Sequence, residues 1–258
     1  MKMSLFIRIL LLTLVLNACA SDVEKEDPEQ SADADARNLY EQASRSMKSG
    51  QFETAIRYFQ FLETRYPYSI YAQQAQLEMA YSNYKFGRPD EAIVEADRFI
   101  RLNPTHERVD YAYFIKGVAH FSKSKTGFFP KWFPRNPAEF EQKPLEEAFT
   151  TFTQLLLKFP DSQYAADARQ RMIYIRDELA EHELITAQHY FKREAYIAAA
   201  SRCRYLLENY SDSRYNIDAI AMMLEAYRKL ELPDMAAEAE RILELNAPDH
   251  GLLKKKKS

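Results

Sequence analysis

The stretch AFTTFTQLLLKFP, residues 148–160, contains the pattern that decides the fold. Its first residue, Ala148, is followed by Phe152 four positions later, by Leu155 seven positions later and by Pro160 twelve positions later. Offsets of four and seven lie on one face of an α-helix, and proline ends a helix because its nitrogen carries no hydrogen. The stretch therefore predicts a helix with an apolar face, on which the small alanine lets a neighbouring helix approach closely.

Four further segments repeat this pattern with few changes. They are Ala55-Phe59-Leu62-Pro67, Ala92-Ala96-Phe99-Pro104, Ala199-Cys203-Leu206-Ser211 and Ala236-Glu240-Leu243-Pro248. The five alanines are 37, 56, 51 and 37 residues apart. The pattern resembles the second helix of a tetratricopeptide repeat (TPR), a helix pair of about 34 residues. We therefore expect an all-α superhelical solenoid of about five helix pairs.

The two long intervals need separate explanations. Residues 122–144 carry four prolines, and we interpret them as an insertion in the third repeat. The same segment holds five large aromatic residues, so we expect it to be ordered and mostly non-helical. Residues 163–193 contain neither proline nor glycine and predict one long continuous helix.

The N-terminus has the features of a secretion signal. Lys2 and Arg8 flank the apolar run 9–16, which is shorter than the about 20 residues needed to span a bilayer. The following residues, Leu16-Asn17-Ala18-Cys19, resemble a bacterial lipobox, which implies cleavage after Ala18 and diacylation of Cys19. Residues 1–18 are therefore predicted to be a lipoprotein signal peptide, with an ordinary signal peptide and an incidental cysteine as the alternative.

The residues after Cys19 indicate the membrane and the domain limits. No aspartate stands beside the cysteine, which by resemblance to enterobacterial sorting rules favours the outer membrane, with the protein facing the periplasm. Residues 22–35 are rich in Asp, Glu, Ser and Ala, so we expect 19–36 to be a flexible tether. The solenoid is expected over 37–250, followed by a basic tail at 251–258.

Composition and motifs indicate neither an enzyme nor a nucleic-acid-binding protein. The net charge is −3, and the five glycines are too scattered to form a phosphate-binding loop. His182 and Glu183 begin a zinc-protease motif that Thr186 interrupts, so no metal or cofactor is predicted. Each histidine is expected at the surface or as a helix cap, and Cys203 is expected in the core.

A solenoid without catalytic residues presents its inner surface for binding peptides or proteins. Residues of the expected first helices, among them Tyr71, Gln74, Tyr84 and Tyr111, would line this surface. Tyrosines beside amides suit an extended, partly apolar peptide. Packing between repeats is an equally good explanation for any single tyrosine.

Two strings of sequence resemble a known family. They are RYPYSIYAQQAQL at 65–77 and DRFIRLNPTH at 97–106, supported by DARQR at 167–171. Both resemble the BamD family, the TPR lipoproteins of the β-barrel assembly machinery, and the resemblance covers nearly the whole mature chain. One departure is PKWFPRNP at 130–137, where the family usually has a short acidic-basic turn.

The resemblance implies two binding regions. N-terminal repeats would bind the C-terminal targeting strand of unfolded outer-membrane proteins, and C-terminal repeats would dock on the central barrel subunit, with accessory lipoproteins as further partners. The implied peptide-binding residues are Tyr68, Tyr71, Gln74, Tyr84, Arg98, Arg101 and Tyr111. The implied partner-binding residues are Arg202, Asp218 and Tyr190, although an exposed arginine could equally be a solvated surface charge.

Two other functions fit an anchored TPR protein. A pilotin that assists secretin or type IV pilus assembly is the main alternative, and an activator of peptidoglycan enzymes is a third. The string at 97–106 favours the β-barrel assembly function over both.

Overall fold

The computed structural model describes residues 28–124 and 142–254. Its helices follow one another in antiparallel pairs. In order they are α2 (Pro28–Lys48), α3 (Phe52–Arg65), α4 (Ile70–Phe86), α5 (Pro89–Leu102), α6 (Val109–Lys123), α7 (Lys143–Lys158), α8 (Ala165–Lys192), α9 (Tyr196–Asn209), α10 (Asn216–Lys229), α11 (Pro233–Asn246) and α12 (Gly251–Lys254). Over these residues the chain forms five helix pairs and no strand, which confirms the predicted TPR solenoid.

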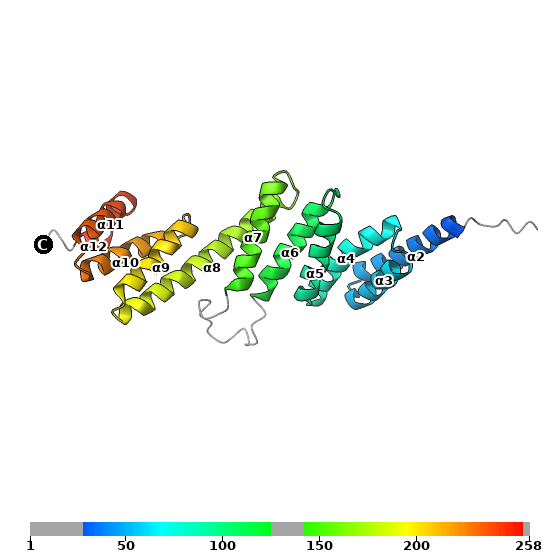
Figure 1. Ribbon diagram of the computed structural model, residues 1–258, viewed down its shortest axis with the longest axis horizontal. Coiled ribbons are helices and arrows are strands. Elements are labelled where there is room, and N and C mark those ends of the chain that lie inside the picture. The colour runs from blue at the N-terminus through cyan, green and yellow to red at the C-terminus, as the bar shows by residue number, and fades with distance from the viewer. Residues whose placement is uncertain (1–27, 125–141, 255–258) are drawn as a thin grey trace, which may run out of the picture.

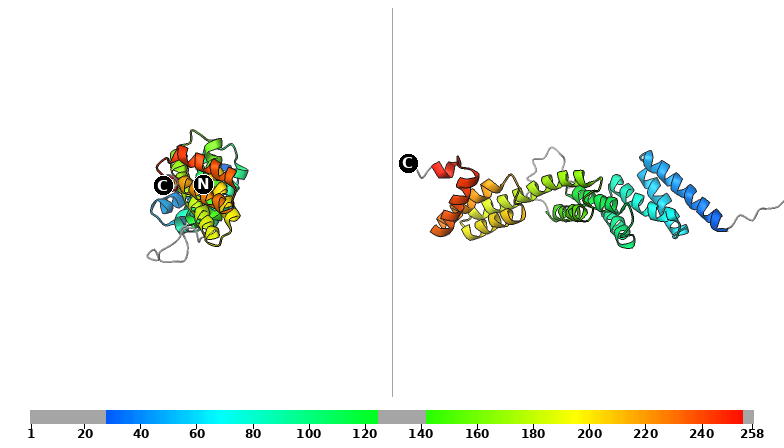
Figure 2. Two further views of the ribbon diagram at one scale, coloured as in Figure 1. Left: turned by 90° about the vertical axis from the view of Figure 1, so that its left-hand side faces the viewer. Right: turned by 90° about the horizontal axis from the view of Figure 1, so that it is seen from above.

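The pairs stack side by side into an elongated rod (Figure 1). Seen along its long axis the rod is narrow (Figure 2, left). Seen from above, helix α2 lies at one end of the rod and helix α12 at the other (Figure 2, right). Neighbouring pairs also touch through their first helices, because α2 contacts α4, α4 contacts α6 and α8 contacts α10. The first helices therefore form a row along one side of the second helices, with direct contacts from α2 through α4 to α6 and again between α8 and α10.

The recurring apolar positions form the core, as the sequence pattern predicts. The alanine that starts each copy is buried, and so are the large apolar residues, namely Phe59, Leu62, Phe99, Phe152, Leu155, Leu206 and Leu243. Cys203 is also in the core, where burial raises the pKa of its thiol to about 12. The exception, Glu240, has its carboxylate 3.2 Å from Arg228 Nη2, so an ion pair to α10 compensates the charge at this position.

Each second helix in the described residues ends in the same way. The last hydrogen bond is donated by the residue before the proline or serine of the pattern, and the carbonyl of the apolar residue four positions earlier accepts it. The donors are Tyr66, Asn103, Phe159, Tyr210 and Ala247. A residue before proline is sterically driven out of the helical conformation, so the helix stops one residue early.

The turn that follows also carries a repeated device. Two residues after the proline or serine position, a side chain accepts a hydrogen bond from the backbone N–H two residues further on, at 3.0–3.4 Å. The acceptors in the described turns are Ser69, His106, Ser162, Ser213 and His250. Each acceptor satisfies a free N–H at the start of the next helix. His250 thus acts as a helix cap, as predicted, whereas His106 closes the turn before α6, whose N-cap residue is Arg108.

The ends of the folded body differ from the expected limits. Helix α2 begins at Pro28, within the expected tether, and Ala36 is fully buried. The alanines of residues 28–36 favour a helix, and the packing of Ala36 holds it in place. At the other end α12 follows the cap at His250, and its Leu252 and Leu253 pack against the last helix pair. The signal peptide, Cys19 and residues 255–258 lie outside the described residues.

The two long intervals agree with the sequence analysis where they are described. Helix α8 is continuous over 28 residues, as predicted. The insertion lies between α6 and α7, the two helices of the third pair. We expected it to be ordered, and this expectation concerns residues 125–141, which lie outside the described residues.

Helices α6 and α7 of the third pair approach each other closely at Gly117, where an added Cβ atom would lie 2.4 Å from the Phe152 ring. Within the described residues, no helix combines the length and apolar character that crossing a membrane requires.

Candidate functional site

A hollow of about 460 Å³ opens between α2 and α4, on the row of first helices. Its lining combines an aromatic ring, a thioether and charged side chains. The lining residues are Tyr40, Glu41, Ser44, Arg45, Met47, Lys48 and Glu78. Tyr40 and Met47 offer apolar surface to a ligand, while the exposed Arg45 and Lys48 offer positive charge. The hollow therefore suits a segment with an apolar side chain next to a carboxylate.

Glu78 is a buried acid in this hollow, and the third helix pair neutralises it. Arg108, at the start of α6, places Nη1 3.0 Å from Glu78 Oε1. The Tyr40 ring lies 5.7 Å from the Tyr71 ring and 5.9 Å from the Phe59 ring. Burial, and then the nearby Glu78, raises the pKa of Tyr40, so its phenol stays neutral. These contacts fix the hollow across three successive helix pairs.

Two of the implied peptide-binding residues lie beside the hollow. Tyr71, Gln74 and Glu78 are three, four and seven residues apart on α4, so they share one helix face. Tyr71 packs on Tyr40 and also starts α4, where its N–H donates to Ser69. Gln74 is exposed, with an amide available for hydrogen bonds to a peptide backbone.

Tyr111 and Tyr84 are packing residues in the structure. The Tyr111 ring lies 5.1 Å from that of Tyr164, which in turn stacks on Phe114 at 4.8 Å. Burial, and then Glu78, raises the pKa of Tyr111. Tyr84 is partly buried against the main core. Both fit the alternative interpretation of packing between repeats.

The remaining three implied residues lie elsewhere. Tyr68 is in the turn between α3 and α4, and the exposed Arg101 is on α5. Arg98, also on α5, pairs with Glu63 of α3 at 2.6 Å, so it links two successive second helices. The structure therefore does not bring the seven residues into one site.

Most residues that line the hollow lie on α2 and were not predicted from the sequence. The predicted lining residues began in the second repeat, and the first helix starts nine residues before the predicted start of the solenoid at residue 37. The sequence pattern that could have indicated them is the spacing of Tyr40, Ser44 and Met47, which lie four and three residues apart and so share one face of α2.

The implied docking residues lie on the C-terminal half of the rod. Arg202, on α9, has a side chain that is 45% exposed, and its Nη1 lies 3.2 Å from Oε2 of Glu183 on α8. The Glu183 side chain is only 10% exposed. Tyr190 is partly buried near the end of α8, and Asp218 is exposed in the first turn of α10, where the helix dipole favours a carboxylate.

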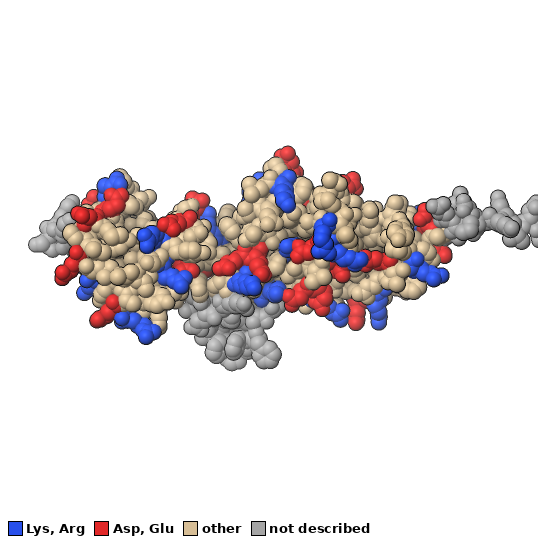
Figure 3. Space-filling view, in the orientation of Figure 1, with Lys and Arg blue, Asp and Glu red and all other residues tan. Residues whose placement is uncertain are grey.

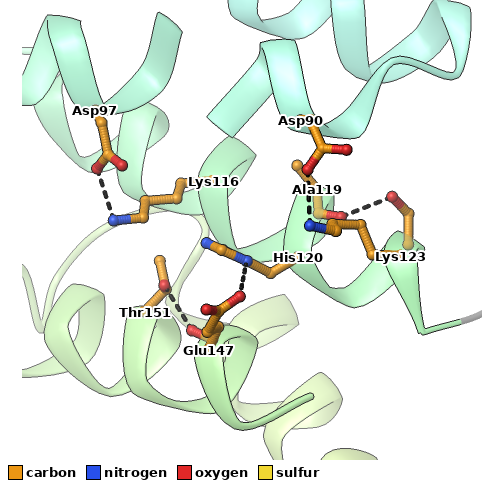
Figure 4. Close-up of polar contacts among 9 residues, drawn as sticks. Asp90, Asp97, Lys116, Ala119, His120, Lys123, Glu147 and Thr151 are labelled. Atoms are coloured by element: carbon orange, nitrogen blue, oxygen red, sulfur yellow. Dashed lines mark hydrogen bonds and ion pairs between the residues drawn. The ribbon is translucent and has the colours of Figure 1, made fainter. Parts of the chain in front are cut away.

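A polar joint connects α5, α6 and α7 (Figure 4). His120 Nδ1 lies 3.0 Å from Glu147 Oε2, while Lys116 and Lys123 pair with Asp97 and Asp90 of α5 at 2.6 and 2.7 Å. His120 is buried, so the expectation that every histidine lies at the surface or caps a helix is wrong here. Burial, opposed by Glu147, lowers the pKa of His120.

The charges on the surface are mixed. Lys and Arg alternate with Asp and Glu over the face of the rod in Figure 3. In the part of the chain that the structure describes, no three side chains of His, Cys, Asp or Glu are grouped so that they could hold a metal ion.

Comparison with known proteins identifies the family. The sequence model of YfiO, described as an outer membrane lipoprotein, matches residues 32–242. A protein of Neisseria meningitidis serogroup B named outer membrane protein assembly factor BamD is 38% identical, over 94% of this chain and 91% of its own. The chain belongs to the BamD family.

Other BamD proteins match over similar lengths. The Vibrio cholerae protein is 34% identical over 92% of this chain and 96% of its own, and a Xylella fastidiosa protein (strain 9a5c) is 37% identical over 85% and 75%. Among solved structures, the crystal structure of MamA protein covers 81% of this chain and 90% of its own at 16% identity, with a TM-score of 0.42. The resemblance to the BamD family drawn from the sequence strings is thus confirmed.

Proposed function

We propose that this protein is an outer-membrane lipoprotein subunit of a β-barrel assembly complex, and that its N-terminal hollow binds targeting strands of unfolded outer-membrane proteins. Membership of the BamD family over residues 32–242 is the observation that carries the proposal. Acyl chains on Cys19 hold the protein at the outer membrane, facing the periplasm. The rod docks on the central barrel subunit, beside accessory lipoproteins.

The hollow matches the chemistry of such a strand. A targeting strand has alternating apolar residues and ends in an aromatic residue with a free carboxylate. The aromatic ring packs against Tyr40 and Met47, and the carboxylate pairs with Arg45 and Lys48. Gln74 donates to the peptide backbone.

Peptide binding tests this arrangement. A fluorescent strand peptide with a free carboxyl terminus binds wild type more tightly than the double variant Arg45→Glu/Lys48→Glu, by about tenfold, which is equivalent to roughly 1.4 kcal/mol. The same peptide with an amidated terminus binds wild type and variant equally, because its charge is gone. Arg204→Glu, an exposed arginine on α9, serves as the control. Equal affinities of wild type and the double variant for the free-acid peptide contradict the proposal.

Docking is proposed at the C-terminal half, with Arg202 as the central contact and Tyr190 and Asp218 beside it. A half-exposed guanidinium has N–H groups left for a partner's carboxylate after pairing with Glu183. A pull-down from detergent-solubilised outer membranes, read by mass spectrometry, recovers the barrel subunit with wild type and much less with Arg202→Gln. Recovery of a secretin in place of the barrel subunit identifies the protein as a pilotin.

A further inference from the structure

Exposed apolar side chains gather at one corner of the rod, where α3 turns into α4. Tyr68 is 100% exposed and Ile70 is 68% exposed. A hollow of about 360 Å³ adjoins them, lined by Ala32, Asp33, Arg65, Tyr66, Pro67, Tyr68, Ser69 and Ile70. A tyrosine has an apolar ring and a polar tip, a combination that is favoured where a membrane meets water.

This corner is next to the start of the folded body. Tyr66 donates a hydrogen bond from its hydroxyl to Asp35 Oδ2 of α2 at 3.2 Å, and Ala32 and Asp33 line the adjoining hollow. Asp33 is five residues from Pro28, which is about 8 Å along a helix. Helix α2 forms one end of the rod (Figure 1).

The connection to the proposed anchor is short. Residues 20–27 separate Cys19 from Pro28, and a fully extended chain of that length spans at most about 30 Å. Acyl chains on Cys19 therefore keep the start of α2 within about 30 Å of the bilayer that holds them.

We propose that the α3–α4 corner rests in the headgroup region of the bilayer that holds the anchor, with Tyr68 and Ile70 inserted. The inference rests on the proposed lipid anchor at Cys19 and adds a second contact that orients the rod against the membrane. Arg65 meets lipid phosphates, whereas Asp33 and Asp35 oppose a strongly anionic surface. Zwitterionic lipid is therefore sufficient, and added anionic lipid does not strengthen the contact.

Tryptophan fluorescence of the lipidated full-length protein tests this contact. The chain has one tryptophan, so Trp132→Phe provides a silent background for Tyr68→Trp. The protein is reconstituted in phosphatidylethanolamine vesicles with a minor fraction of phosphatidylglycerol, with and without lipids brominated near the headgroup. Ile173→Trp, at an exposed position on α8, is the matched control in the same background.

We expect the Tyr68→Trp emission to shift to the blue on vesicles and to be quenched at least twofold more by brominated lipid than the Ile173→Trp emission. Vesicle-bound protein with equal quenching at the two positions overturns the corner contact and leaves the anchor intact. Protein that does not float with vesicles overturns the anchor and this inference with it. An equal blue shift in the mature chain without Cys19 and without vesicles shows that the chain itself covers the corner, and also overturns the inference.

Discussion

The guanidinium of Arg202 and the carboxylate of Glu183 lie 3.2 Å apart across the interface of α9 and α8, so a half-exposed arginine neutralises a buried acid. The proposed docking residue is therefore already engaged inside the chain. A partner carboxylate has to share this guanidinium, because taking it away would leave Glu183 buried without its cation.

Arg202→Gln tests this pair in the isolated protein. We expect a loss of about 1 kcal/mol in the free energy of unfolding, the lower end for an unpaired buried acceptor, because solvent screens the exposed half of the arginine. Adding Glu183→Gln recovers most of the loss, as urea denaturation can measure. Arg204→Gln on the same helix is the control and changes little; an equally small effect of Arg202→Gln would mean that the pair contributes no stability.

Gly117→Ala tests the closest contact between α6 and α7. The new Cβ atom would lie 2.4 Å from Cε1 of Phe152, a fully buried ring, so one of the two helices has to move. Overpacking of this kind costs about 1–3 kcal/mol, measurable as a fall in the urea midpoint. Gly251→Ala, which meets open space, leaves stability unchanged.

A second substitution separates overpacking from other effects at this glycine. Phe152→Leu removes part of the ring and is destabilising alone, but it costs less in the Gly117→Ala background. Strictly additive losses would show that the two positions do not clash.

Ser162→Ala tests the repeated cap. The Ser162 hydroxyl oxygen accepts from the Tyr164 N–H at 3.2 Å, and the hydroxyl donates to Asp110 Oδ2 at 2.6 Å. Tyr164 is the N-cap residue of α8, so the substitution removes hydrogen bonds in the turn before the helix, each contributing about 0.5–1.5 kcal/mol. The matched control is Ser211→Ala, an exposed serine at the proline position of the pattern. If both variants were equally stable, the cap at Ser162 would be unimportant.

The His120 joint makes stability depend on pH. Burial keeps the pKa of His120 below its value in the unfolded chain, about 6.5, with Lys116 and Lys123 in the same direction and Glu147 and Asp97 opposed. The unfolded state therefore binds more protons, so this contribution is complete above the unfolded pKa and is lost as pH falls below it.

His120→Asn removes this dependence. Between about pH 7.5 and pH 5, the melting temperature of wild type falls more steeply than that of His120→Asn, so the difference between them narrows. His189→Asn, an exposed histidine on α8, follows wild type. Parallel curves for wild type and His120→Asn would contradict the predicted role of His120.

The helices and their buried faces could be predicted because they depend on nearby residues. Each alanine, apolar and proline position lies within about one helix length of the others, so a single pattern identifies a whole helix. The sequence of 163–193 likewise indicated one helix, since nothing in it could interrupt one. The start of α2 was missed because it has no comparable pattern and depends on the packing of Ala36.

The site could be predicted only in part because it depends on contacts between distant residues. Glu78 in the hollow is neutralised by Arg108, 30 positions later in the chain, and Tyr111 packs against Tyr164, 53 positions later. Helical spacing identifies which residues share a face of one helix. It does not identify which of these faces is buried against the neighbouring helix pair. Tyr71 and Gln74 therefore share the face of α4 that carries Glu78, whereas Arg98 lies on α5 and pairs with Glu63.

The length of α8 has a consequence for the geometry of the whole protein. This one helix joins the half of the rod with the hollow to the half with Arg202, so its residue count sets the angle between their faces. One inserted residue would advance the C-terminal half by about 1.5 Å and rotate it by about 100°. Arg202 would then point away from its original direction even though every repeat remained folded. Insertions and deletions are thus tolerable in loops of this protein but not within α8, because the length of α8 fixes the orientation of the two proposed binding surfaces relative to each other.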